Sequence, residues 1–154
     1  MSVYAKGTSV SAEKSRAEIE TTLRRYGADR FAYATDATSA QVAFEAAGRR
    51  VRFSVQFDSL DEHRLTETGR DRSDAAAYKA WEQSTRERWR SLCLLIKAKL
   101  EAIDSGIAEF ETEFLPHLVL PGGVTIGERL APQLEQVCST GNLPPLLAAP
   151  GGSR

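Results

Sequence analysis

The sequence is poor in the residue types and motifs that most often carry chemistry. Its 154 residues include two cysteines and two histidines. It has no Gly-rich phosphate loop, no nucleophile elbow and no Cys/His spacing typical of zinc. Asp58, Asp61, Glu62 and His63 gather oxygen and nitrogen donors, but their loop lacks a Gly-anchored ligand pattern. We therefore expect a non-enzymatic protein without a metal or cofactor.

Long apolar runs are also absent. The longest, Leu92 to Ile96, is far shorter than a membrane span, and no apolar segment near the N-terminus resembles a signal peptide. The two cysteines, Cys93 and Cys138, are isolated, which favours structural roles in a reducing compartment over a disulfide between them. These features predict a cytoplasmic protein that does not enter the membrane.

Charge is balanced overall but unevenly distributed. The net charge is −1, with nine Lys or Arg against six Asp or Glu in residues 1–57 and two against five in residues 105–154. A basic front and an acidic back suit either an anion-binding face or complementary faces in a self-assembly. An ordinary mixed, solvated surface explains the same distribution.

The longest regular pattern is helical and covers residues 73–105. This stretch has no Pro or Gly, opens with the cap residues Ser73 and Asp74, and would run about 48 Å as a helix. One face of this spine helix carries Tyr78, Thr85, Trp89, Leu92, Ile96, Leu100 and Ile103. We expect Trp89, Leu92 and Ile96 to pack against a sheet that includes Phe53 and Val55. Trp81 is expected in the core as well, with Cys93 as a small buried apolar residue.

Three short strands precede the spine helix. Residues 30–35, 40–46 and 49–57 alternate apolar and polar side chains, most regularly in the last segment. Turn residues separate them, which predicts a three-stranded antiparallel meander that needs a helix on its apolar face. Before the strands, Ser15 and Glu18 form a capping-box pattern that predicts a helix from there to Tyr26.

The segments around and after the spine helix are less regular. Residues 58–72 predict a mobile or functional loop. Residues 107–114 predict either a second short helix beyond Gly106 or a kinked extension of the spine helix. Residues 115–120 predict a brief strand, and the Thr125–Glu128 capping box a helix to about Val137. The fold class is therefore α+β, with an N-terminal helix, a meander, a spine helix and a C-terminal helical cap. One domain covers residues 1–141, and residues 142–154 form a poorly ordered Pro/Gly-rich tail.

The basic residues are the main candidates for a binding site. On the third strand, Arg50 and Arg52 face water and Arg49 lies at the hairpin tip. A stripe on the spine helix and two loop arginines could join them in tracking a phosphate backbone, while Tyr33 stacks on bases. The candidate nucleic-acid-binding residues are thus Arg49, Arg50, Arg52, Arg70, Arg72, Lys79, Arg86, Arg90, Lys97 and Tyr33. Acidic residues four positions from Arg86 and Lys97 fit the alternative, an ordinary ion-paired surface.

Four segments carry a resemblance to known proteins. They are RRYGADRF, GRRVRF, WEQSTRERWRSL with LLIKAKLEAI, and FLPHLVLPGG with TIGE. Together they resemble a family of small uncharacterised proteins encoded in phages and prophages. The resemblance implies a phage-type origin and a role near replication or recombination genes, but no known activity. The order of helix, three strands and helix is also similar to that of double-stranded-RNA-binding and strand-annealing modules, as a fold analogy.

Two functions remain open from the sequence. The first is a nucleic-acid-binding protein, with single-stranded DNA favoured, that acts as a homo-oligomer. The alternative is a protein-interaction or inhibitory module that docks on a host or phage protein through its long helix. A contiguous Arg surface on the wet sheet face would favour the first, and an exposed apolar patch would favour the second. Leu94 and Leu95, which lie off the main stripe of the spine helix, support self-association.

Overall fold

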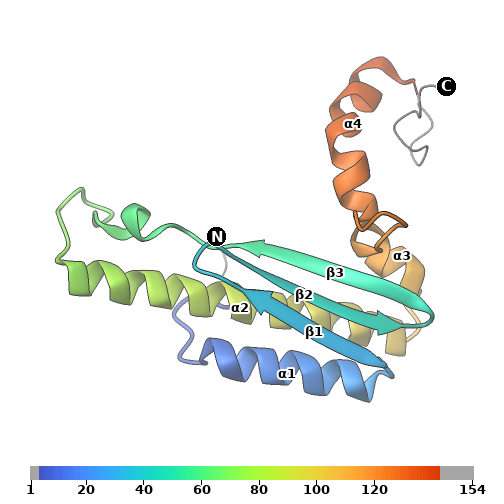
Figure 1. Cartoon of the computed structure of the whole chain (residues 1–154), viewed down its shortest axis with the longest axis horizontal. Coiled ribbons are helices and arrows are strands. Elements are labelled where there is room, and N and C mark those ends of the chain that lie inside the picture. Colours follow the sequence, from blue (N-terminus) through green and yellow to red (C-terminus); the bar gives the residue numbers. More distant parts are fainter. Residues whose placement is uncertain (1–3, 143–154) are drawn as a thin grey trace.

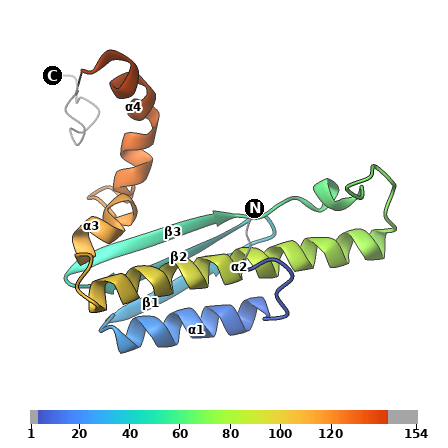
Figure 2. The same ribbon diagram turned by 180° about the vertical axis from the view of Figure 1, so that it is seen from behind.

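A computed structural model describes residues 4–142 of the chain as one antiparallel sheet with helices on one of its faces (Figure 1). The strands β1 (Arg30–Thr35), β2 (Ser39–Ala46) and β3 (Arg49–Gln56) pair in sequence order. Helices α1 (Ala12–Arg25) and α2 (Asp74–Asp104) lie side by side against the sheet (Figure 2). This arrangement confirms the α+β prediction. The predicted tail lies outside the described residues, except for Asn142.

The alternation of side chains along the strands decides which face of the sheet is buried. Val42 pairs with Tyr33 on one side and with Phe53 on the other, so apolar residues of all three strands share one face. Ala47 and Gly48 connect β2 to β3 with φ angles of 52° and 71°. Two successive residues with positive φ fit a type I′ hairpin turn, whose twist matches that of the flanking strands.

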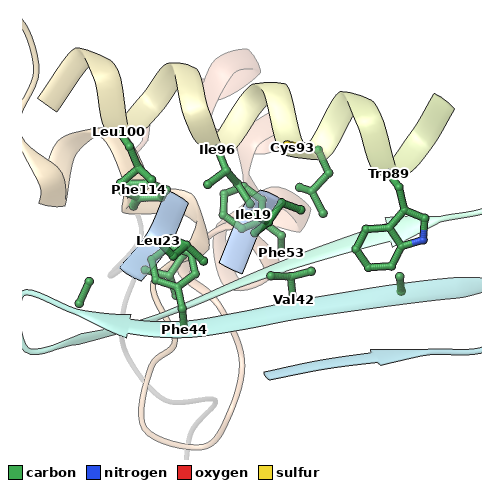
Figure 3. Close-up of a cluster of buried hydrophobic side chains, with 14 of the residues drawn as sticks. Ile19, Leu23, Val42, Phe44, Phe53, Trp89, Cys93, Ile96, Leu100 and Phe114 are labelled. Carbon is green, nitrogen blue, oxygen red and sulfur yellow. The ribbon is translucent and has the colours of Figure 1, made fainter. Parts of the chain in front are cut away.

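The core lies between this sheet face and α2 (Figure 3). Trp89, Leu92 and Ile96 belong to the same buried cluster as Phe53, and Val55 packs against that cluster. The predicted packing of the spine helix on the meander is therefore confirmed. Cys93 is fully buried there, and desolvation raises the pKa of its thiol, as expected for an inert core residue.

Helix α1 begins earlier than the sequence pattern predicted. Ser11, not Ser15, is the N-cap, and its hydroxyl accepts a hydrogen bond from the Lys14 amide at 3.1 Å. Ser15 lies one turn inside the helix and is fully buried. Glu18, the predicted partner in the capping box, instead binds Arg90 and Lys97 of α2. The Ser15 capping-box prediction is therefore wrong, because both side chains face the neighbouring helix.

The first turns of α2 extend beyond the sheet, and the loop of residues 58–72 packs there instead. Tyr78, predicted on the core face, is 51% exposed. Trp81 is half-buried outside the main core and donates a hydrogen bond to the Asp58 carbonyl at 2.9 Å. The loop contains the short helix η1 (Leu60–His63), and Arg72 donates to the carbonyls of His63 and Leu65. These hydrogen bonds from side chains to backbone carbonyls connect the end of the loop to its middle and attach the loop to α2.

The segment after α2 differs from its prediction in two ways. Ile107 is 82% exposed, and the short helix α3 (Phe110–Phe114) starts only after it, since Gly106 breaks the helix with a φ of 79°. The expected strand at residues 115–120 is largely the short helix η2 (Leu115–His117), whose Pro116 lacks the N–H that a strand ladder needs. Only isolated bridges follow, Val51 with Leu118 and Val119 with Thr125.

The C-terminal helix is present and begins where its capping box predicted. It is α4 (Ile126–Thr140), and Figure 1 shows it standing away from the sheet. Both halves of the box are formed, because Thr125 accepts from the Glu128 amide and Glu128 accepts from the Thr125 amide. Within residues 4–142, no helix combines the length and apolarity needed to span a bilayer.

Candidate functional site

The most unusual surface of the described chain is the apolar side of α4. Ile126, Leu130, Leu134 and Val137 fall within an arc of about 80° on the helical wheel. Such an arc normally packs against a core, yet no residue of α4 is buried and Leu134 is 54% exposed. Ile126, Leu130 and Val137 are only partly buried, so no element among residues 4–142 covers the arc completely.

Arg52 fixes the base of α4 to the sheet. Its guanidinium donates to the Gly123 carbonyl at 2.7 Å and forms an ion pair with Glu128 at 2.7 Å. The Thr125 amide, with Arg52 as a further contributor, holds the pKa of the Glu128 carboxyl below its usual value. Arg52 was predicted to face water, but its side chain is only 21% exposed. It positions α4 rather than standing free on the sheet.

A close backbone contact completes this anchor. A Cβ atom at Gly127 would lie 2.8 Å from the Pro116 carbonyl oxygen, so the first turn of α4 can approach η2 only because residue 127 lacks a side chain. Ile126 packs against the core cluster, and its amide donates to the Leu118 carbonyl at 2.9 Å. The first turn is thus docked, while Leu134 and Val137 lie farther along the same arc.

The arginines of β3 do not form a contiguous basic surface. Arg50 is 61% exposed but pairs with Glu45 at 2.9 Å on the neighbouring strand. Arg49 at the hairpin tip pairs with Glu111 at 2.8 Å. Between them and the far end of the sheet, the outer face carries small or neutral side chains from all three strands: Ala32, Ala34, Gln41, Ala43 and Ser54. No aromatic side chain lies on this outer face.

The predicted basic stripe on α2 lies on the other side of the sheet and largely faces α1. Arg90 and Lys97 each bind the Glu18 carboxylate at 2.6 Å, and Arg86 donates to the Gln83 side-chain oxygen. These contacts, Lys97 first, lower the pKa of Glu18. The structure therefore does not bring the α2 stripe and the β3 arginines onto one surface.

The remaining candidate residues are scattered. Arg72 is bound within the loop, whereas Arg70 and Lys79 are exposed and form no ion pair among the described residues. Tyr33 is 50% exposed on the helix-facing side of β1, where the Arg16 guanidinium lies 4.9 Å from the centre of its ring. That ring is already stacked within the chain.

The acidic loop residues serve structural contacts. Asp58 accepts from the Ser84 hydroxyl and from Arg88, and these bonds, Ser84 first, lower its pKa. Glu62 caps η1 and Asp61 pairs with Arg64. Across residues 4–142, no three His, Cys, Asp or Glu side chains gather as a metal site would require.

Sequence reasoning located α4 but missed what makes it distinctive. The capping box and the apolar spacing were visible, whereas the exposure of the apolar side among residues 4–142 depends on where residues 115–125 direct the chain. The alternation along β3 predicted only that Arg52 is exposed, because its partners Gly123 and Glu128 lie more than 70 residues away in the sequence. No protein-family model, curated protein or solved structure matches the chain.

Proposed function

We propose that this protein is a non-enzymatic interaction module that docks on a protein partner through the apolar arc of α4. The observation that carries the proposal is a capped, 15-residue amphipathic helix with no buried residue. An amphipathic helix laid into an apolar groove is a common mode of protein recognition. Ile126, Leu130, Leu134 and Val137 supply the anchors at the required spacing.

The remainder of the chain acts as a scaffold in this proposal. The long helix α2 was the expected docking element, but its apolar face is consumed by the core through Trp89, Leu92 and Ile96. Arg52 and Gly127 fix the base of α4, which reduces the entropy lost when a partner binds. We place the protein in the cytoplasm, in the phage or prophage setting that the resemblance implies. Two free thiols support a reducing compartment.

Site-specific photo-crosslinking in the native cells tests this proposal. A photoreactive residue at position 134, on the apolar arc, is compared with one at position 136, on the opposite side of α4. We expect a discrete protein adduct from position 134 and none from position 136. With the photoreactive residue moved to position 137, the substitution Leu134→Glu should abolish the adduct. The substitution Gln136→Glu, tested with the same probe, should not. Equal adducts from both sides of the helix, or none from position 134, would refute the proposal.

Nucleic-acid binding is the second candidate, supported by one observation. Arg30, Arg49 and Arg50 are well exposed at one end of the sheet, and carboxylates pair with each of them. A phosphate backbone would have to displace Glu45 and Glu111 from these guanidiniums. If it does, three contacts to single-stranded DNA predict a log–log salt slope of about −2. Fluorescence anisotropy at two salt concentrations measures this slope, and Arg30→Gln with Arg50→Gln should reduce it. If the protein binds no single-stranded DNA at low salt, nucleic-acid binding is refuted and the docking proposal remains.

A further inference from the structure

A groove between α1 and α2 has the dimensions and lining of a helix-binding site. It has a volume of about 750 Å³ and lies on the side of the two helices that faces away from the sheet. The uncharged residues that line it are mostly small, with Ala17 and Thr21 from α1 and Leu94 and Ala98 from α2. Small side chains permit the close approach of a third helix, at the 8–10 Å axial distance usual for helix pairs.

The charges at the rim of this groove complement those of α4. Lys14, Arg25 and Lys97 line it against Glu18 and Glu101, which leaves a net charge of +1. The free part of α4, residues 130–140, carries Glu135 and no Lys or Arg, a net charge of −1. Opposite charges around an apolar contact steer the partners and fix their orientation.

The lengths also agree. From Lys14 to Tyr26, both of which line the groove, α1 rises about 18 Å. The part of α4 beyond its docked base, residues 130–140, rises about 15 Å. The free portion of α4 therefore fits along the groove without an overhang.

The α4 of the same chain does not reach this groove. Figure 2 shows α1 and α2 side by side on one face of the sheet, and α4 pointing away from both. Arg52 and the Gly127–Pro116 contact hold its base in that direction. An occupant with the chemistry of α4 must then come from a second molecule.

We propose that α4 of one molecule binds the α1–α2 groove of a second copy, giving a head-to-tail assembly. This inference rests on the proposed docking function of α4 and names its partner. Because the two surfaces in contact are different, a bound pair retains one free groove, on the molecule that supplies the helix, and one free helix, on the molecule that supplies the groove. Such an interface continues into a ring or an open chain unless one surface is blocked.

Complementation between two defective variants tests the head-to-tail contact. Leu134→Glu places a charge on the apolar arc of α4, and Leu94→Glu places one in the groove. Ala98→Glu is a second groove variant, at an exposed site, and leaves the core untouched. We expect wild-type protein to associate with rising concentration in analytical ultracentrifugation, and each variant to weaken association about tenfold or more. An equimolar mixture of Leu134→Glu with Ala98→Glu should form a one-to-one dimer, because it retains one intact helix and one intact groove.

Matched controls separate this inference from its alternatives. Leu95→Glu, at an exposed position on α2 that does not line the groove, and Gln136→Glu, on the polar side of α4, should associate like the wild type. If both groove variants associate normally while Leu134→Glu does not, α4 binds a surface other than the groove and the head-to-tail contact is refuted. A monomeric wild type at high concentration also overturns it. The docking function itself fails if crosslinking from position 134 finds no protein partner, or if positions 134 and 136 give equal adducts.

Discussion

Helices α2 and α4 are both amphipathic, yet only one of them has a core to bury its apolar side. Six residues of α2 are buried, with Trp89 and Ile96 among them, whereas α4 has none. The sheet explains the difference, because its one apolar face is filled by α1 and α2. Amphipathic spacing therefore identifies a helix that needs a partner, but it does not say whether that partner lies in the same chain.

The two helices are also held by different kinds of contact. α2 packs through a broad apolar area, and burial of such area is the main stabilising contribution in a fold of this size. α4 is held at its first turn by an ion pair, a close glycine contact and a few backbone bonds. Local anchors of this kind orient a helix without burying its apolar side.

The same Leu→Ala substitution on each helix should give the largest difference in the free energy of unfolding. Leu92→Ala removes a side chain that is 5% exposed in the core, and we expect the free energy of unfolding to fall by about 2–5 kcal/mol. Leu134→Ala removes the same atoms from a 54% exposed site, and we expect a change within about 0.5 kcal/mol. Urea denaturation at low protein concentration measures both. Similar losses for the two variants would mean that α4 is covered within its own molecule.

The fold could be predicted from the sequence because its signals are local. The alternation in residues 49–57 and the turn at Ala47–Gly48 specify a hairpin within a few residues. The spine helix needs only its Ser73 cap and its apolar period. The start of the first helix was misplaced because Ser15 and Glu18 match a capping box locally. In the structure Ser11 provides the cap, and Glu18 binds Arg90 of the neighbouring helix.

The candidate site was harder to predict, since it depends on partners far apart in the chain. Arg90 looked like part of a free basic stripe, but its partner Glu18 lies 72 residues earlier. Alternation alone places Arg50 and Arg52 on the same outer face, but only the path of residues 118–128 shows that Arg52 is engaged there. A periodic pattern predicts which face a charge lies on, and not whether another segment neutralises it.

Substitution of Gly127 tests the anchor of α4 by steric pressure. Gly127→Ala places a Cβ against the Pro116 carbonyl at 2.8 Å, so the first turn of α4 must shift away from η2. We expect a loss of about 1–3 kcal/mol, as for overpacking elsewhere, confined to the attachment of α4. Hydrogen exchange should show faster exchange in α4 with little change in α2. Gly122→Ala, where nothing lies within 4 Å of the new Cβ but φ is 98°, separates backbone strain from the steric contact.

Arg52 tests the electrostatic half of the same anchor. Arg52→Lys keeps the charge but loses the forked geometry that reaches the Gly123 carbonyl and the Glu128 carboxylate together. We expect hydrogen exchange at the first turn of α4 to increase by about tenfold, the equivalent of one lost charge-assisted hydrogen bond. The control Arg50→Lys changes an exposed pair with Glu45 and should leave α4 unaffected. If exchange in α4 is unchanged by Arg52→Lys, the contacts of Arg52 do not hold the helix, and the glycine contact and backbone bonds suffice.

The smallest effect is expected where α2 is tied to α1 by charge. The Glu18 carboxylate binds Arg90 and Lys97 at a partly exposed site, so Glu18→Gln should cost about 0.5–1 kcal/mol near neutral pH. The pKa of Glu18 is lowered below its ordinary value of about 4.5, so the stabilisation is fully present above that pH. It is lost as the pH falls through the lowered pKa of the folded state, when both states become protonated. Unfolding free energies of the wild type and Glu18→Gln should therefore converge on acidification, and raised salt should also reduce the difference between them.

Glu13→Gln is the control for this prediction. Glu13 lies on the exposed side of the same helix and pairs with Arg16, so this pair does not join the two helices. A difference between the wild type and Glu18→Gln that persists after the pH has fallen well below the lowered pKa of folded Glu18 would show that Glu18 stabilises the helix pair by packing and not by its charge.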